Sequence, residues 1–342
     1  MKNNEIYLQD LVHSLKHAHV KLDLEFLNKL LQNASKCEKP WRNKEFAQEI
    51  CCLTPGKPHS ISSIYVWIKG KRTIPMSKLI KIVNLSDYNL LDIEKKLISI
   101  KAGAHKGEIK PKFPIKIGHQ LGSIVGHILG DGAIDKRGHT VFYSNSNPEL
   151  LSEFIHFMEE IVGAKPRIWV QKKRLFNEKT EWLRRVKNVR DVPKKHSVGL
   201  FYPKICCDIL HSLFGKFADG KKKQITSQIK KAPSDFKKGL IRAFFDDEGS
   251  IRSQDHLMKF HQDNKQMLKD LKLILQELGI NTNPIRTYIK GNKERCYFSL
   301  TGFNEYCRFH YLIGCTSSKK RIEFELLIKK VTNSRKMKNK VR

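Results

Sequence analysis

Acidic residues are scarce in this 342-residue sequence: 34 Asp and Glu stand against 65 Lys and Arg, which leaves a formal net charge of +31. This excess is larger than solubility requires. It indicates a polyanionic partner, because basic side chains that neutralise phosphates release counterions. A lysine-rich surface is the alternative, but it explains only part of the excess and not its clustering.

Long apolar runs are also missing, and the first residues lack the apolar core of a signal peptide. We therefore expect an intracellular, cytoplasmic protein. The eight cysteines include no Cys-x-x-Cys spacing, so a structural zinc site is not predicted and buried reduced thiols are favoured. The length predicts two or three domains.

Two segments of the chain repeat one another without a gap, at residues 122–134 (GSIVGHILGDGAI) and 239–251 (GLIRAFFDDEGSI). The offset is 117 residues, so Asp131 aligns with Glu248. An ungapped repeat of this length indicates a duplicated structural unit. It predicts a pseudo-twofold protein in which the two carboxylates meet near the axis.

Glycine recurs every fourth position from Gly118 to Gly130, and Gly239 and Ala243 occupy two of the matching positions in the second copy. Glycine lowers helix propensity by roughly 1 kcal/mol relative to alanine, so several in one helix need a structural reason. Close approach of two helix backbones is such a reason. We expect the two helices to pack along these small residues and to end at Asp131 and Glu248.

These paired motifs resemble those of the LAGLIDADG family of homing endonucleases, over roughly residues 115–330. The matches are 124–132 and 241–249, and the family's catalytic acid then falls on Asp131 and Glu248. The first copy departs at Leu129, where the motif usually has aspartate, but Asp246 fills this position in the second copy.

The resemblance implies an α+β fold, with a duplicated αββαββα core and pseudo-twofold symmetry, and the periodicities agree with it. A turn and strand at 135–145 precede an amphipathic helix over 148–162, and a strand over 257–262 precedes a helix to about Leu278. The boundaries that we expect are a first repeat over 117–216, an inter-repeat linker over 217–233, a second repeat over 234–328, and a basic tail over 329–342. The tail is either a frayed extension that contacts phosphates or a disordered one.

Residues 1–100 are helical in pattern and predict an all-α DNA-binding domain, joined to the core by a basic linker over 101–116. Helices at 43–50, 60–69 and 78–85 are similar to a phage-repressor helix-turn-helix over about 43–85. An ordinary helical bundle is the alternative. In the helix-turn-helix interpretation the residues that face DNA are Ser62, Ser63, Tyr65 and Lys69, followed by Lys71 and Arg72.

The first repeat carries 18 more residues than the second, within a basic stretch at 171–195. A hairpin extension that widens the DNA footprint is one interpretation, and a disordered surface insertion is the other. We expect DNA contacts from Lys172, Lys173 and Arg174 in this stretch, and elsewhere from Lys136, Arg137, Lys222, Lys259 and Lys319.

The resemblance also implies the parts of an active site. Asp131 and Glu248, with Gly130 and Asp247, would bind Mg²⁺ or Mn²⁺, which supplies activated water and charge neutralisation in phosphodiester hydrolysis. Asn145 and Gln262 match the positions that orient water. The clusters 221–223 and 319–320 offer the lysines near the scissile phosphates, and we assign Lys223 and Lys320.

The function that follows is a monomeric, site-specific, metal-dependent endonuclease that cleaves double-stranded DNA across the minor groove. We expect it to be free-standing rather than part of an intein, because the terminal splicing Cys or Ser and the closing His-Asn are missing. A non-cleaving transcriptional regulator of the WhiA type is the main alternative, although such regulators lose the acids. An RNA-splicing maturase is a third possibility.

Overall fold

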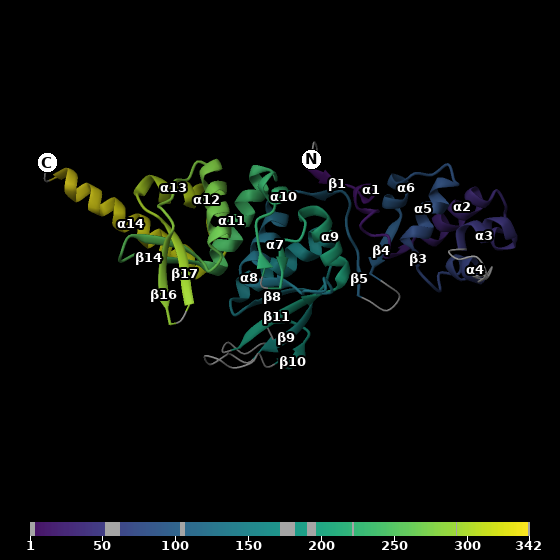
Figure 1. Cartoon of the computed structure of the whole chain (residues 1–342), viewed down its shortest axis with the longest axis horizontal. Helices are drawn as coiled ribbons and strands as arrows, with labels where there is room; N and C mark the ends of the chain where they lie inside the picture. The colour runs from purple at the N-terminus through teal and green to yellow at the C-terminus, as the bar shows by residue number, and fades with distance from the viewer. Residues whose placement is uncertain are drawn as a thin grey trace. The chain divides into compact units, whose positions relative to one another are not determined.

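The computed structural model describes residues 4–51, 62–102, 107–171, 182–189, 196–220, 222–291 and 293–340. These residues fall into two compact units (Figure 1). The first comprises residues up to Ile115 together with 162–164 and 203–212, and the second comprises 116–161, 165–202 and the chain from Leu213 onward. No helix in these described ranges is long and apolar enough to cross a membrane.

The first unit contains both helices and strands, so an all-α N-terminal domain is not confirmed. Its sheet has the order β3-β2-β4-β5, and β2 pairs antiparallel with both β3 and β4. The sequence pattern concealed these strands because each is short and its partner lies far away along the chain. The elements are β1 (Glu5–Ile6), α1 (Leu8–Leu11), β2 (His19–Leu22), α2 (Leu24–Ser35), η1 (Pro40–Arg42), α3 (Lys44–Cys51), α4 (Ser62–Ile68), β3 (Ile74–Pro75), α5 (Met76–Asn84), α6 (Leu90–Lys95), β4 (Leu97–Lys101) and β5 (Glu108–Ile109).

The segment expected to be a linker at 101–116 is partly structured. β5 lies within it and pairs with β4, and the short strand β6 (Ile115–Lys116) follows. A run of Gly, Pro and Lys therefore separates regular elements here rather than forming one continuous spacer.

Two successive copies of a helix, followed by strand pairs and further helices, make up most of the second unit. The first copy is α7 (His119–Leu129), β7 (Gly132–Ile134), β8 (Val141–Asn145), α8 (Pro148–Phe157) with the π-helical turn η2 (Met158–Val162), β9 (Arg167–Gln171), β10 (Trp182–Val186), β11 (Ser197–Tyr202) and α9 (Lys204–Phe214), of which residues 204–212 belong to the first unit. The second copy is α11 (Ser234–Glu248), β14 (Gly249–Arg252), β15 (Leu257–Gln262), α12 (Lys265–Glu277), β16 (Arg286–Lys290), β17 (Lys293–Leu300), α13 (Phe303–Leu312) and α14 (Ser318–Lys340).

The two sheets share one strand order. The first runs β10-β9-β11-β8-β7-β12-β13, and the second runs β16-β17-β15-β14, so β8 corresponds to β15 and β11 to β17. The additional strand β10 comes from the basic insertion and pairs antiparallel with β9, as a hairpin extension requires. Between the copies lie β12 (Ala218–Asp219), β13 (Lys222–Lys223) and α10 (Ser227–Lys230), so the inter-repeat linker is also structured.

One face of each sheet packs against helices, because alternate side chains along the strands are apolar. In the first copy Tyr143 is fully buried, and its ring centroid lies 4.6 Å from that of Phe154 on α8. In the second copy Phe260 is fully buried, and its ring centroid lies 4.9 Å from that of Phe245 on α11. The basic tail, expected to be frayed or disordered, continues α14 as helix to Lys340.

Candidate functional site

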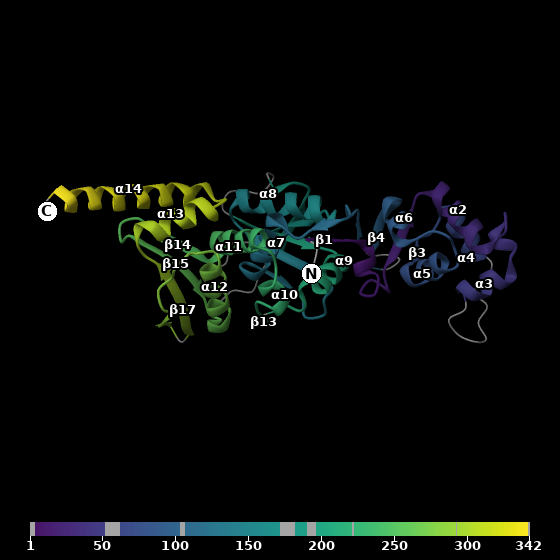
Figure 2. The same ribbon diagram turned by 90° about the horizontal axis from the view of Figure 1, so that it is seen from above.

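Helices α7 and α11 lie side by side in the second unit, and their backbones touch where glycine leaves no side chain (Figures 1 and 2). A Cβ placed on Gly122 would lie 2.0 Å from the carbonyl oxygen of Phe236, and one on Gly239 would lie 2.0 Å from that of His119. By the 117-residue offset Gly122 corresponds to Gly239 and His119 to Phe236, so the two contacts are equivalent. The helix pair therefore has the reciprocal contacts of a pseudo-twofold axis, as the glycine spacing predicts.

Further equivalent positions face each other along this axis. A Cβ on Gly126 would lie 2.9 Å from that of Ala243, and a Cβ on Gly130 would lie 2.7 Å from that of Asp247. The axial position at the end of the helix pair is thus glycine in one copy and aspartate in the other. The second copy contributes a third carboxylate between the two candidate catalytic acids.

Asp131 and Glu248 occupy equivalent positions on either side of this axis. The loss of hydration there raises the pKa of Asp131 to about 7, with repulsion from Asp247 and Glu248 adding to it and Lys223 opposing it. Burial also raises the pKa of Glu248, against the attraction of Lys223. The pKa values of both acids are therefore raised first by burial, and repulsion between neighbouring carboxylates adds to this effect.

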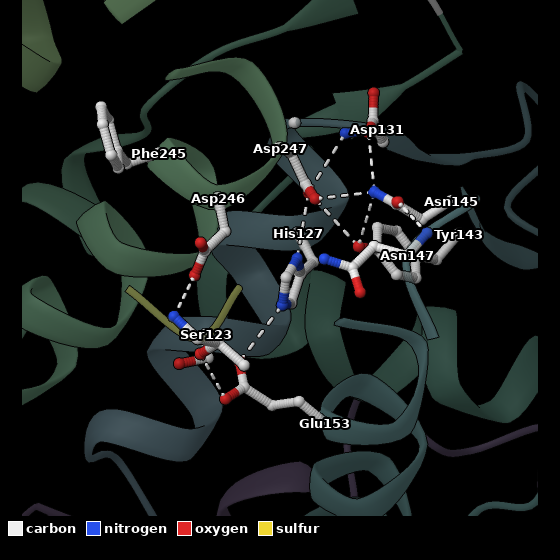
Figure 3. Close-up of polar contacts among 12 residues, drawn as sticks. Ser123, His127, Asp131, Tyr143, Asn145, Asn147, Glu153, Phe245, Asp246 and Asp247 are labelled. Atoms are coloured by element: carbon white, nitrogen blue, oxygen red, sulfur yellow. Dashed lines mark hydrogen bonds and ion pairs between the residues drawn. The ribbon is translucent and has the colours of Figure 1, made fainter. Parts of the chain in front are cut away.

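The side chain of Asp247 is fully buried and binds three side chains of the first copy (Figure 3). It accepts hydrogen bonds from the Tyr143 hydroxyl at 2.9 Å and the Asn145 amide at 3.1 Å, and it lies 3.0 Å from Nδ1 of His127. The same Asn145 amide donates to Asp131 at 3.0 Å. The second motif thus helps to position the first acid through Asn145.

His127 is a residue that the sequence analysis missed. It is fully buried on α7, with Nε2 lying 3.4 Å from Glu153, while Glu153 also accepts from Arg242 at 2.9 Å and from the Thr316 hydroxyl at 2.8 Å. Burial alone would lower the pKa of His127, but Asp247 and then Glu153 raise it to about 9. The sequence feature that could have identified His127 is its position among the apolar residues of a glycine-rich helix.

Because Glu153 balances both His127 and Arg242, Glu153→Gln should leave buried positive charge without its counterion. We expect the free energy of unfolding to fall by about 3 kcal/mol, the scale for breaking a buried ion pair. Urea denaturation followed by circular dichroism measures this change. Glu160→Gln is the matched control, since Glu160 is exposed and pairs with the exposed His156; its effect should stay below about 0.5 kcal/mol. Equal losses in both variants would contradict the role of Glu153.

The two assigned lysines both reach the ends of the motif helices. Lys223 donates to the carbonyl of Gly130, and Lys320 donates to the carbonyls of Phe245 and Asp246, each at 2.6 Å. Burial lowers the pKa of both lysines, while the neighbouring carboxylates raise it. Within each predicted cluster, the side chains of Lys222 and Lys319 are exposed instead.

Asn145 and Gln262, predicted to be equivalent, differ in their contacts. Asn145 bonds to Asp131, whereas the Gln262 side chain accepts from the backbone N–H of Asp263 at 2.9 Å, just before α12. The described residues contain no group of three His, Cys, Asp or Glu side chains arranged to hold a metal ion. Asp131 and Glu248 nevertheless fit a hard cation in chemistry, because both are carboxylates, the oxygen ligands that such cations prefer.

The predicted DNA contacts are spread over several elements. Lys136 and Arg137 are exposed in the turn between β7 and β8, and the ammonium of Lys259 lies 4.3 Å from the ring centroid of Tyr297 on the second sheet. Lys172, Lys173 and Arg174 lie outside the described residues. The helix-turn-helix candidates Ser63, Tyr65 and Lys69 lie on or directly after α4, with Lys71 and Arg72 beyond it; Ser62 begins the helix.

Helix α4 has the two faces that the helix-turn-helix interpretation requires. Tyr65 is exposed and the Lys69 ammonium lies 5.7 Å from its ring centroid, while Ile64 and Trp67 are buried. The connection at 52–61 lies outside the described residues, so the motif itself stays a prediction.

Comparison with known proteins supports the LAGLIDADG family. Residues 235–314, the second repeat, match the family model of the LAGLIDADG-like domain. No curated protein matches the chain. Among solved structures, mesophilic variants of the homing endonuclease I-DmoI are similar at 13% identity over 58% of this chain and 96% of theirs, with a TM-score of 0.39.

Two further solved structures are similar to this chain. I-DmoI in complex with DNA and Mn is 12% identical over 58% of this chain and 98% of that one, with a TM-score of 0.39. Full-length DUF199/WhiA from Thermatoga maritima is 12% identical over 64% of this chain, with a TM-score of 0.42, and the match spans 61% of that protein.

Proposed function

We propose that this protein is a site-specific DNA endonuclease of the LAGLIDADG type, which cleaves both strands with the aid of a divalent cation such as Mg²⁺ or Mn²⁺. One observation carries the proposal: Asp131 and Glu248 lie at equivalent positions beside the pseudo-twofold axis, and each motif helix end receives a lysine. A carboxylate and a lysine that both occur twice suit a reaction that is performed once on each DNA strand.

Asp131 and Glu248 are the residues that would hold the cation, which when bound polarises the phosphate and lowers the pKa of water. Asp247 already binds His127, Tyr143 and Asn145 through both oxygens, so its role is to position Asn145 and, through it, Asp131. Lys223 and Lys320 place positive charge beside the acids, where the transition state of phosphoryl transfer concentrates negative charge.

DNA would lie along the faces of the two sheets that helices do not cover. On the second sheet this face carries Lys259, which lies between buried residues on its strand, and Arg295, which precedes the buried Cys296. Arg286 shares this face, because it pairs with Tyr297 on the neighbouring strand. Strands enter the major groove, which is about 12 Å wide, more readily than the minor groove of about 6 Å. With a sheet in the major groove on each side, the axial acids would meet the minor groove between them.

Binding that depends on many phosphate contacts should weaken steeply with salt. We expect log affinity to fall linearly with log salt concentration, with a slope magnitude of roughly 6 to 10. Fluorescence anisotropy with a labelled duplex between 50 and 400 mM KCl, about the practical range for such contacts, measures the slope. A flat dependence would contradict the inference from the charge of +31.

A non-cleaving regulator with the same fold is the second candidate. The observation that favours it is the buried, fully bonded state of Asp247, which is typical of a structural carboxylate. Together with an N-terminal helix-turn-helix, such a core would bind a specific duplex without cutting it. Incubation with a randomised DNA library and Mg²⁺, followed by sequencing of the ends, separates the two: defined ends support the endonuclease, and tight binding without cleavage supports the regulator.

A further inference from the structure

The face of the first sheet that points away from α8 carries a row of apolar side chains. Ala133 on β7 pairs with Phe142 on β8, and Phe142 pairs with Phe201 on β11, so the three side chains follow one another across the sheet. All three are half-buried, and the two phenyl ring centroids lie 5.0 Å apart. This face of the first sheet therefore presents an aromatic surface where DNA is expected.

The same row on the second sheet is polar. By the 117-residue offset Ala133 corresponds to Ser250 and Phe142 to Lys259, and Lys259 pairs with Ser299 on β17 as Phe142 pairs with Phe201. Apolar side chains at three positions of one repeat are thus replaced by two hydroxyls and an ammonium in the other. At these three positions the second sheet is polar where the first is apolar, although the exposed Arg167 on β9 continues the row of the first sheet beyond Phe201.

The neighbouring row differs most clearly at its position on β9 and β16. On the first sheet it consists of Ser144, Gly199 and Trp169, which pair across β8, β11 and β9. On the second sheet the row is His261, Tyr297 and Arg286. The guanidinium of Arg286 stands where the first sheet has the indole of Trp169. An indole and a guanidinium therefore differ at this one position of the second row, while Arg185 on β10 pairs with Trp169 in the first sheet.

The aromatic row also forms the floor of a depression of about 930 Å³. Ala133, Phe142 and Phe201 line it, together with two lysines, Lys136 and Lys222, and two aspartates, Asp135 and Asp219. The apolar part of this lining complements one feature of DNA, the major-groove edge of thymine, which carries an apolar C5-methyl group. A guanine edge offers two acceptors instead and suits arginine or lysine.

We propose, building on the endonuclease function above, that the two repeats read chemically different half-sites. Phe142 and Phe201 of the first repeat contact thymine methyl groups, while Lys259 and Arg286 of the second repeat donate to guanine acceptors. The recognised sequence is then asymmetric, with thymines specified beneath the first repeat and guanines beneath the second.

Base analogues test this directly on the full-length protein. A duplex selected from a randomised library is resynthesised with uracil in place of thymine, one half-site at a time, which removes only the methyl groups. Each methyl group lost beneath the first repeat should weaken binding about fourfold, as expected for a buried carbon group. Uracil in the other half-site should have no effect, whereas 7-deazaguanine there should weaken binding because it lacks the N7 acceptor.

Variants identify which half-site lies beneath which repeat. The double variant Phe142→Lys with Phe201→Ser recreates the row of the second sheet, so it should lose its sensitivity to uracil. Phe142→Leu keeps an apolar side chain and should retain this sensitivity, even if the double variant folds poorly by circular dichroism. Phe157→Ala, a half-buried phenyl group on α8, is the matched control and should leave the preference unchanged.

The two levels of the proposal fail differently. If the protein selects a duplex but binds uracil and thymine equally in both half-sites, methyl recognition by the first repeat is wrong and the DNA-binding function stands. If uracil weakens binding and the double variant remains equally sensitive, thymine is read by other residues and the assignment to Phe142 and Phe201 is wrong. If no duplex is selected at all, the proposed function fails as well.

Discussion

Asp131→Asn or Glu248→Gln is expected to abolish double-strand cleavage, lowering its rate by roughly three orders of magnitude or more, the scale on which removal of a catalytic group acts. Each substitution keeps the size of the side chain and removes the charge that would hold a cation. Affinity for DNA without metal should be unchanged or higher, because two anions that face phosphates repel them. Folding should survive, since both acids already carry raised pKa values.

The measurement is plasmid linearisation with Mg²⁺, beside a binding shift with Ca²⁺. Since each acid serves one strand in the proposed mechanism, a single variant should leave a nicked circle, whereas the double variant should leave the plasmid supercoiled. Asp255→Asn is the control, because Asp255 is exposed in the turn between β14 and β15. This variant should cleave the plasmid as the wild type does. Wild-type protein that binds a specific duplex and never cuts it with Mg²⁺ or Mn²⁺ would establish the regulator instead.

The helix pair and the positions of its two acids could be predicted because the signals were local and duplicated. Four glycines at four-residue spacing specify which face of α7 packs, and the offset then specifies the partner position on α11. The lysines near the acids were harder to predict, because each cluster contains more than one lysine. Only the folded chain shows that Lys223 and Lys320 reach the carbonyl groups at the helix ends.

The buried network around His127 could not be predicted in the same way. Its partners Asp247, Glu153 and Tyr143 come from three different elements, and nothing in the local pattern pairs them. The family resemblance implies a metal ligand at Asp247, whereas the structure shows its side chain bound to His127, Tyr143 and Asn145 of the first copy. The sequence repeat is symmetric at Asp131 and Glu248 but not at Gly130 and Asp247, and the structure places this asymmetry on the axis.

The strands of the N-terminal region could not be predicted for a related reason. β2 and β4 pair although about 80 residues separate them, and strands of four and five residues carry little periodicity of their own. The helices around them were predicted because each shows its own apolar pattern. Pairings between distant segments are the part of this fold that a single sequence leaves undetermined.

Gly122→Ala and Gly239→Ala should each destabilise the protein severely, by about 3 kcal/mol or more, because the added methyl group has no space. A Cβ at either position would lie 2.0 Å from a backbone carbonyl oxygen of the opposite helix. A flexible side chain could move aside, but a helix backbone cannot without separating α7 from α11. Since Asp131 and Glu248 follow these helices, cleavage should be lost together with the thermal transition, as measured by differential scanning fluorimetry and plasmid linearisation.

The control must separate this clash from the general effect of replacing glycine. Gly279→Ala serves, because a Cβ there would meet no atom within 4 Å. Its φ of +77° leaves only the strain of a left-handed conformation, about 1 kcal/mol. Gly122→Ala and Gly239→Ala should therefore destabilise the protein far more than Gly279→Ala does. Their effects should be similar in size, because the pseudo-twofold axis makes the contacts of the two glycines equivalent. If Gly122→Ala is tolerated as well as Gly279→Ala, the helices do not pack at this distance, and the acids are not brought together in the way proposed.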